Sequence, residues 1–149
     1  MKKFQDKVVW ITGSSSGIGE ATAYEFAKEG AKLILTALEA DLLQQVCKKC
    51  EELGSPKAEA LPFDLSQKDQ VAELAEKAWN VFGYIDVFYN NAGISQRSKT
   101  IDTEMKVINK VMDINYFAPV IMTKVILPKM VERGGGHPGW WVHCLPDGL

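Results

Sequence analysis

The sequence predicts an α/β fold built on a doubly wound parallel β-sheet, and three observations lead to this prediction. An apolar run at residues 8–11 breaks into a glycine-rich turn and continues as a helical pattern. Further apolar runs then alternate with amphipathic stretches of ten or more residues, which indicates parallel strands joined by right-handed helical crossovers. Finally, the 149 residues are 46% apolar, which is the length and content of one domain with a core.

The elements follow in order after the first strand. The first helix is predicted to run to about Glu29 and to end at Gly30, a residue type that suits a helix C-terminus. Ser66 and Asp69 have the spacing of a capping box for the third helix. From periodicity we expect the other strands at 31–36, 58–63 and 85–89. The other helices are expected at 42–53, from the capping box at Ser66 to residue 82, and at about 102–131.

The glycine-rich turn at 12–19 has the features of a Rossmann-like dinucleotide site. A diphosphate approaches the backbone closely only where Cβ atoms are missing, and the N–H groups at a helix start attract its charge. A purely structural turn is the alternative, but the preceding strand and the following helix favour the nucleotide site. The expected cofactor-binding residues here are Thr12, Gly13, Ser14, Ser15, Ser16, Gly17, Ile18 and Gly19.

An acidic residue about twenty positions past the glycines suits an adenosine ribose, because a carboxylate accepts hydrogen bonds from its hydroxyls. Glu39, just beyond the second strand, fits this spacing. It equally fits an acidic residue in the first turn of the next helix. In the expected strand order 3-2-1-4, the nucleotide lies at the carboxyl ends beside strand 1, the switch point of the topology.

Three motifs carry a resemblance to a known family. They are Thr12-Gly-x-x-x-Gly-x-Gly19, Asn90-Asn-Ala-Gly93, and Asn115 within residues 112–117. In this order and spacing they resemble the short-chain dehydrogenase/reductase family. The residues at 82–87 and 90–95 are most similar to the branch related to 11β-hydroxysteroid dehydrogenases. The resemblance covers roughly residues 5–133.

The resemblance implies several roles around the cofactor. Asp64, followed by Leu65 at the end of the third strand, would bind the adenine amino group. Many relatives carry a basic residue near Ser16 or Leu38 for the phosphate of NADP, and both positions are non-basic here. The implied cofactor is therefore NAD or NADP, with NAD slightly favoured. The implied cofactor-binding loop after the fourth strand comprises Asn91, Ala92 and Gly93.

Asn115 is the catalytic residue that the resemblance implies, because its backbone carbonyl would hold a water in the proton relay. The sequence adds a reason of its own. In a helix the N–H of residue 119 would bond this carbonyl, but Pro119 has no N–H. A free carbonyl at a helix kink and a plain packing kink fit this pattern equally well.

The family's proton-donating Tyr and Lys, four residues apart, have no counterpart at the expected place. Tyr24 and Lys28 have the spacing, but we interpret them as a coincidence on the wrong helix. When the family pattern is aligned with this sequence without gaps, the position of the catalytic Ser falls near His143, and the positions of the Tyr and Lys fall beyond Leu149. We therefore expect a C-terminally truncated fold with strands 5 to 7 largely missing, comprising an incomplete dinucleotide-binding domain at 1–133 and an atypical, irregular tail at 134–149.

Composition excludes some other classes. Seventeen basic and nineteen acidic residues without a basic run offer no surface for a nucleic acid. The first strand begins too early for a leader or membrane anchor, so we expect no transmembrane segment and a cytoplasmic protein. We interpret Cys47 and Cys50 as core or surface thiols, because a redox pair of this kind sits at a helix N-terminus. We expect no metal site, since His137, His143 and Cys144 lack a fourth ligand.

The resulting functional hypothesis is an NAD(P)-dependent oxidoreductase that interconverts an alcohol and a carbonyl, inactive as this chain alone. The small alcohol or carbonyl substrate is unknown. A second hypothesis is a non-catalytic nucleotide-binding or interaction module, which pairs with a full-length relative, or forms a homo-oligomer, through the helix at 105–130. A third is an unstable product without function.

Overall fold

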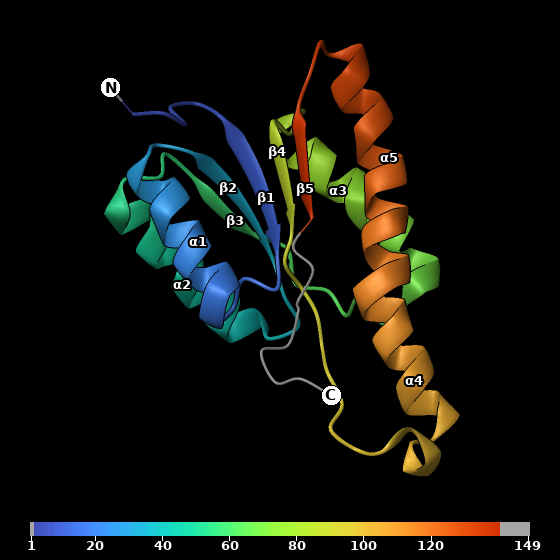
Figure 1. Cartoon of the computed structure of the whole chain (residues 1–149). Helices are drawn as coiled ribbons and strands as arrows, with labels where there is room; N and C mark the ends of the chain where they lie inside the picture. Colours follow the sequence, from blue (N-terminus) through green and yellow to red (C-terminus); the bar gives the residue numbers. More distant parts are fainter. Residues whose placement is uncertain (1, 141–149) are drawn as a thin grey trace.

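A single parallel sheet of five strands organises the chain in the computed structural model, which describes residues 2–140. The strands lie in the order β3-β2-β1-β4-β5 (Figure 1). The expected order 3-2-1-4 is therefore confirmed. The strands are β1 Val8–Thr12, β2 Lys32–Thr36, β3 Ala58–Ala60, β4 Val87–Asn90 and β5 His137–Trp140.

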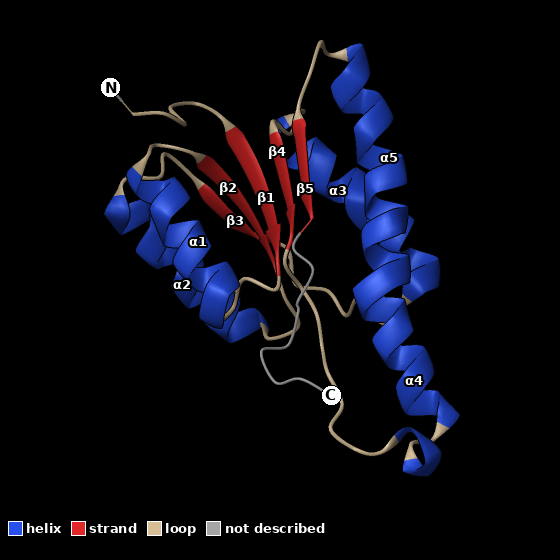
Figure 2. Cartoon of the chain, in the orientation of Figure 1, coloured by secondary structure: helices blue, strands red, loops and turns tan. Residues whose placement is uncertain are grey.

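Helices cover both faces of this sheet. Figure 2 shows α1 and α2 on one side and α3 and α5 on the other. The longer helices are α1 Gly17–Lys28, α2 Ala40–Leu53, α3 Val71–Phe82, α4 Met105–Met112 and α5 Ala118–Glu132. The 3₁₀ turns are Lys68–Gln70 and Thr100–Asp102, and a π-helical turn spans Asp113–Phe117.

Two apolar layers hold the helices on the sheet. Every residue of β1 is buried, because consecutive side chains point to opposite faces and both faces are covered. Trp10 stacks on Phe88 with ring centroids 4.4 Å apart in the layer under α3 and α5. Val9 and Ile11 pack in the opposite layer under α1 and α2. The sheet thus fixes the ends of its strands rigidly relative to one another.

The third strand is shorter than its apolar run predicted. Its ladder ends at Ala60, although the N–H groups of Leu61 and Phe63 still donate to the carbonyls of Leu35 and Ala37 at 2.8 and 2.9 Å. Pro62 lies between them, and its missing N–H costs no bond to β2, because the backbone nitrogen of the intervening residue points to the other side of the strand. The chain nevertheless follows β2 as far as Phe63.

The predicted capping box at Ser66 is wrong. Ser66 binds Asp64 instead of capping the helix. The Asp64 Oδ1 accepts hydrogen bonds from the Ser66 N–H at 2.9 Å and from the Ser66 hydroxyl at 2.7 Å. A local Asp turn of this kind competes with helix capping. The helix therefore starts later, with a 3₁₀ turn at 68–70 and then α3 from Val71.

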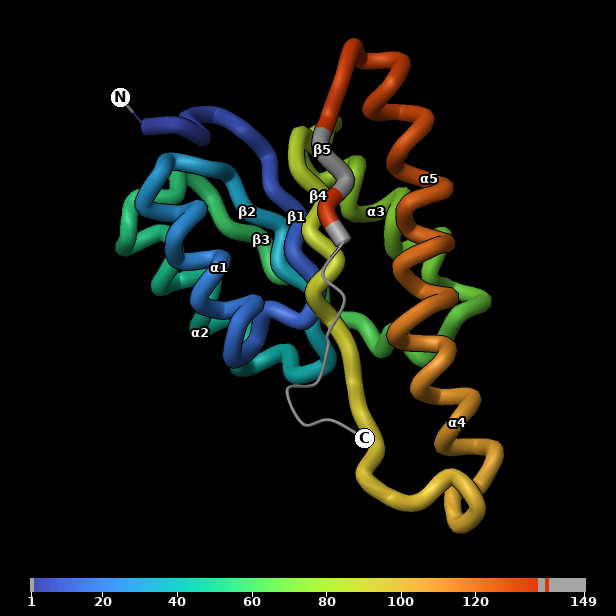
Figure 3. Tube along the Cα trace, in the orientation of Figure 1, coloured from blue at the N-terminus to red at the C-terminus, as the bar shows by residue number. Residues whose placement is uncertain are grey.

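The predicted helix at 102–131 is divided, and the irregularity lies where Asn115 and Pro119 led us to expect a kink. The path runs from α4 into α5 without reversing (Figure 3), but a π-helical turn at Asp113–Phe117 separates them. Pro119 lies in the first turn of α5. Because it has no N–H for the Asn115 carbonyl, the α-helical ladder is broken there and the backbone widens.

The same segment, Met105–Glu132, is long and apolar enough to cross a membrane, with a mean hydropathy of 1.2 over its best window. Length and composition alone are weak evidence, because core helices have the same properties. Here Met122, Ile126 and Met130 are buried against α3 and the sheet. The packing of the domain thus accounts for the apolar side chains on this face.

A fifth strand forms within the stretch for which we predicted an irregular tail. After α5, Gly134 and Gly135 take φ values of 98° and 138°, and the chain then pairs in parallel with β4, Val87 opposite His137 and Asn90 opposite Trp140. Pro138 is compatible with this position because β5 is the outer strand among those described. The rest of the predicted tail, 141–149, lies outside the described residues.

Candidate dinucleotide site

The glycine-rich turn between β1 and α1 is shaped by close backbone contacts. Gly13 and Gly17 have φ values of 66° and 59°, a left-handed conformation that suits glycine. A Cβ on Gly13 would lie 2.7 Å from the Ala92 Cα, and one on Gly19 would collide with the Gly13 carbonyl and the Asn91 side-chain nitrogen. Gly13 therefore permits the loop after β4 to approach the turn, and Gly19 permits helix α1 to pack directly on it.

The start of α1 presents its donors to an open cavity. The helix begins at Gly17, and the Ser16 side chain at the N-cap makes no capping hydrogen bond. The first N–H groups of a helix carry a partial positive charge. This helix end therefore fits an anion such as a diphosphate.

The cavity has a volume of about 500 Å³ and lies at the carboxyl ends of β1 to β4. It combines the glycine turn, the loops after β2, β3 and β4, and one face of the α4 region. Its lining residues are Gly13, Ser15, Ser16, Gly17, Ile18, Ala37, Leu38, Glu39, Phe63, Asp64, Leu65, Asn91, Ala92, Gly93, Ile94, Lys110 and Ile114.

Three of the predicted cofactor-binding residues lie behind the cavity wall. Thr12 is buried, and its hydroxyl oxygen accepts the Asn91 and Ala92 N–H groups at 3.2 and 3.1 Å. Ser14 is buried and donates to the Ile11 carbonyl at 3.2 Å. Gly19 is buried within α1. Their part in the site is to hold the wall in place.

Sequence reasoning missed six lining residues as site members. They share no motif, and only their position at strand ends or on the α4 face brings them to the cavity. Lys110 and Ile114 are one helical turn apart, which places them on the same side of the helix. The six are Ala37, Leu38, Phe63, Ile94, Lys110 and Ile114.

Asn91 ties the loop after β4 to the loop after β1. Its side-chain nitrogen donates to the carbonyls of Thr12 at 3.1 Å and Gly13 at 3.0 Å. Its neighbour Asn90 is also buried, but its amide makes no hydrogen bond within the described chain. Of the two neighbouring asparagines, Asn91 therefore makes the hydrogen bonds between the loops.

Glu39 closes the edge of the cavity beside the glycine turn. It occupies the N-cap position of α2, yet its side chain makes no capping bond. Its carboxylate instead accepts a hydrogen bond from the Ser15 hydroxyl at 3.0 Å. The side chain thus faces the predicted ribose position rather than its own helix.

Asp64 presents an ionised carboxylate to the cavity. Hydrogen bonds from the Ser66 hydroxyl and N–H lower the pKa of this carboxyl, and the nearby charge of Lys110 lowers it further. The interaction therefore contributes stability at neutral pH and loses it as the pH falls through the lowered pKa. A carboxylate here accepts hydrogen bonds, for example from an amino group.

Asn115 holds the loop after β4 from the other side. Its Oδ1 accepts the Ile94 N–H at 2.8 Å, and its Nδ2 donates to the Ile94 carbonyl at 2.7 Å. Asn115 does not itself line the cavity, whereas Ile94 does. The side chain therefore has a positioning role, while the role of its carbonyl in a proton relay stays a prediction.

We expect Asn115→Ala to loosen this loop. The two bonds are exposed, so the loss of unfolding free energy should be about 1 kcal/mol. Faster amide hydrogen exchange at Ile94 would report the local effect. Asn109→Ala, at an exposed position of α4, is the matched control. Unchanged exchange at Ile94 in Asn115→Ala would contradict the positioning role.

The Tyr24 and Lys28 pair has properties opposite to those of a proton relay. The Tyr24 hydroxyl donates to Glu20 at 2.6 Å, and burial together with this carboxylate raises the pKa of Tyr24 to about 12. Lys28 instead pairs with Glu25. Since a relay lysine lowers the pKa of its tyrosine, the interpretation as a coincidence is supported.

The two described cysteines are core thiols, as predicted. Cys47 and Cys50 are buried and free, and burial raises their pKa values to about 11 and about 12. They therefore stay protonated and unreactive at neutral pH. Residues 2–140 contain no group of three metal-ligating side chains, while His143 and Cys144 lie outside the described residues.

Together these features are those of a dinucleotide-binding α/β domain: a glycine turn, a helix start and an acidic side chain at the switch point of a parallel sheet. A sequence model described as short chain dehydrogenase matches residues 7–137. The chain belongs to this short-chain dehydrogenase family.

Individual relatives agree with this assignment. Dehydrogenase/reductase SDR family member 7 of Homo sapiens is 41% identical over 134 residues, covering 88% of this chain and 40% of the relative. Member 7B of Danio rerio is 43% identical over 141 residues, covering 89% of this chain and 45% of the relative. The chain thus spans less than half the length of these curated relatives.

Solved structures show the same fold. L-sorbose reductase from Gluconobacter frateurii, complexed with NADPH and L-sorbose, matches with a TM-score of 0.87 and 30% identity, covering 93% of this chain and 53% of that one. A metagenomic short-chain oxidoreductase in complex with NADP also has a TM-score of 0.87, with 28% identity, and the match covers 92% of this chain and 62% of that one.

Proposed function

We propose that this chain binds a nicotinamide dinucleotide and forms the cofactor half of an oxidoreductase that interconverts an alcohol and a carbonyl. One observation carries the proposal: a single cavity joins the start of α1 with the carboxylates of Glu39 and Asp64. The diphosphate fits the helix start, the ribose fits Glu39 and the base fits the end of β3. Two similar solved structures hold NADPH or NADP.

Glu39 favours NAD over NADP in this proposal. Its carboxylate already accepts the Ser15 hydroxyl, which holds it where a ribose 2′-hydroxyl would donate. A 2′-phosphate at the same place would meet a like charge and be repelled. Ser16 and Leu38 beside it supply no cation.

The test is a calorimetric titration of the purified chain with NAD and with NADP. We expect NAD to bind more tightly, and Glu39→Gln to reduce the difference about tenfold by removing the repulsion. Asp41→Asn, in the first turn of α2, makes the same change of charge outside the cavity and should preserve the preference. Absence of binding to either dinucleotide would refute the proposed function, and tighter NADP binding by wild type would refute the NAD preference alone.

We propose that this chain by itself transfers little or no hydride. Of the described residues that line the cavity, none is a tyrosine, so a tuned proton donor is lacking there. Assays of NADH formation with simple secondary alcohols should accordingly stay near the uncatalysed rate while NAD still binds. Turnover approaching that of an ordinary enzyme would contradict this.

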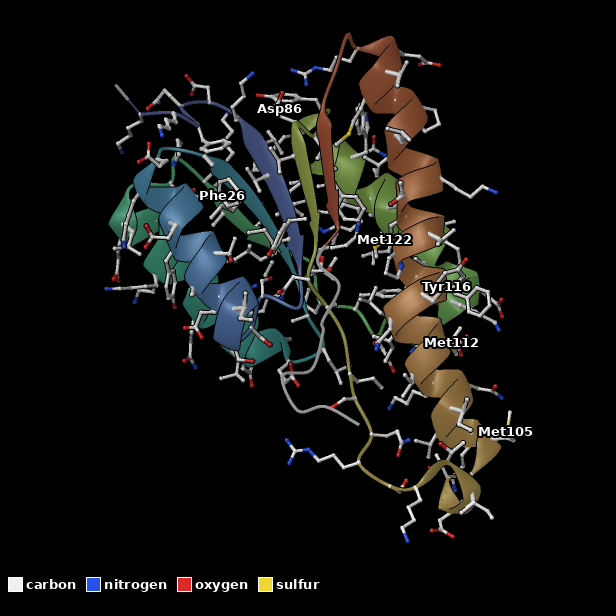
Figure 4. The ribbon with its side chains drawn as sticks, viewed as in Figure 1. Phe26, Asp86, Met105, Met112, Tyr116 and Met122 are labelled. Carbon is white, nitrogen blue, oxygen red and sulfur yellow. The ribbon has the colours of Figure 1, made fainter. Side chains whose placement is uncertain are left out.

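A second candidate is an interaction module, favoured by apolar side chains on the outer side of α4 and of the π-helical turn that follows it. Met105 is 64% exposed and Tyr116 is 53% exposed, whereas Met122 points toward the sheet (Figure 4). We propose that this surface pairs with a second copy or a full-length relative. Co-expression with a tagged relative, followed by size-exclusion chromatography, tests it, and a monomer that captures no relative would count against it.

A further inference from the structure

Lys110 stands out among the charged residues of the cavity. It is the only cation among the described lining residues, where Glu39 and Asp64 are the two carboxylates. It lies on α4, on the same side as Ile114, and lines the cavity together with Asp64 of the loop after β3.

Two other lysines near α4 form ion pairs, but Lys110 does not. Lys106 pairs with Glu104 at 2.7 Å, and Lys68 pairs with Asp113 at 3.3 Å. Lys110 forms no ion pair within residues 2–140 and is exposed. Its ammonium group is near enough to Asp64 to help keep that carboxyl ionised. It is therefore free to rearrange when a ligand enters.

The position of Lys110 relative to a dinucleotide follows from the site proposed above, on which this inference rests. The diphosphate lies at the start of α1 and the ribose at Glu39, so the base lies beyond them, between Leu65 and Ile114. Lys110 is one helical turn from Ile114 and so lies at the outer edge of this base position. A lysine stem covers apolar surface readily while its charge stays in water.

We propose that Lys110 closes the adenosine end of the cavity and determines affinity for the adenine nucleotide half of the ligand. Its methylene stem covers the base beside Ile114. Its ammonium group offsets the Asp64 carboxylate and the phosphate charge of the ligand. Without it, the described lining would present two carboxylates and no cation to an anionic ligand.

The test compares Lys110→Met, which keeps the stem, and Lys110→Glu, which reverses the charge, in calorimetric titrations with NAD and AMP. We expect Lys110→Glu to weaken both ligands about tenfold and Lys110→Met about threefold, the size of charge effects at a partly exposed site. Lys106→Glu, one turn away and outside the cavity, should change neither affinity. Circular dichroism verifies that each variant is folded.

The outcomes separate this inference from the proposed function. Wild-type affinity for NAD together with an unchanged affinity in Lys110→Glu overturns the role of Lys110 and leaves dinucleotide binding standing. An equal loss for nicotinamide mononucleotide, or a larger loss for NADP than for NAD, overturns the placement at the adenine end. Absence of NAD binding by wild type overturns both proposals.

Discussion

Gly19→Ala should unfold most of the chain or leave it without a dinucleotide site. The added Cβ would collide with the Gly13 carbonyl and lie 2.5 Å from the Asn91 side-chain nitrogen. A backbone atom cannot rotate away as a side chain does, so α1 must move off the turn. We expect a loss of about 3 kcal/mol or more, at the upper end of overpacking effects.

Gly17→Ala is the matched control for this change. Gly17 also belongs to the turn and has a positive φ, but a Cβ there would meet no atom within 4 Å. Only the left-handed conformation opposes the substitution, at about 1–2 kcal/mol. The variant should therefore fold but bind NAD weakly, because its methyl group enters the cavity. Urea unfolding of both variants measures the difference, and equal stability would contradict the packing argument.

Asn91→Leu should have the second largest effect, because it removes the link between the loops after β1 and β4. The leucine side chain is nearly the size of the asparagine side chain but cannot donate to the Thr12 and Gly13 carbonyls. Since Asn91 is 7% exposed, water cannot readily replace both bonds. We expect a loss of about 2–4 kcal/mol in unfolding free energy.

The same change should also weaken NAD binding, because Gly13 and Asn91 both line the cavity. Asn80→Leu, at an exposed position of α3, makes the same substitution where no buried carbonyl depends on it. Its stability should stay within about 0.5 kcal/mol of wild type. If Asn91→Leu matched that control in urea unfolding, the cross-loop bonds would not be holding the site.

Local rules explain how far the sequence predicted the helix boundaries. Gly30, Gly54 and Gly83 end their helices in the left-handed conformation, and glycine is the residue type that does this without strain. The predicted start of α3 was wrong because Ser66 does not cap the helix. Its N–H and hydroxyl instead donate to the side chain of Asp64, two residues earlier. Two local hydrogen-bonding arrangements were open to Ser66, and the residue spacing alone does not reveal which of them is the more stable.

The site was predicted in part for a similar reason. Motifs identify residues that the backbone itself requires, such as Gly13 and Gly19, and Glu39 followed from its distance along the chain. Lys110 and Ile114 reach the cavity from α4, more than 90 residues after the glycine turn. Nothing in their local sequence indicates a nucleotide, because their placement depends on how α4 packs.

The sequence by itself thus determined the parallel sheet, its strand order and the glycine turn, since apolar periodicity and the lack of a Cβ act over a few neighbouring residues. The tertiary structure alone decided which turn residues face the cavity and which support it, and it brought Lys110 opposite Asp64. It also placed β5 beside β4, where a proline is compatible because β5 is the outer strand of the sheet within the described residues. These outcomes depend on contacts between segments far apart in the chain, which local patterns do not encode.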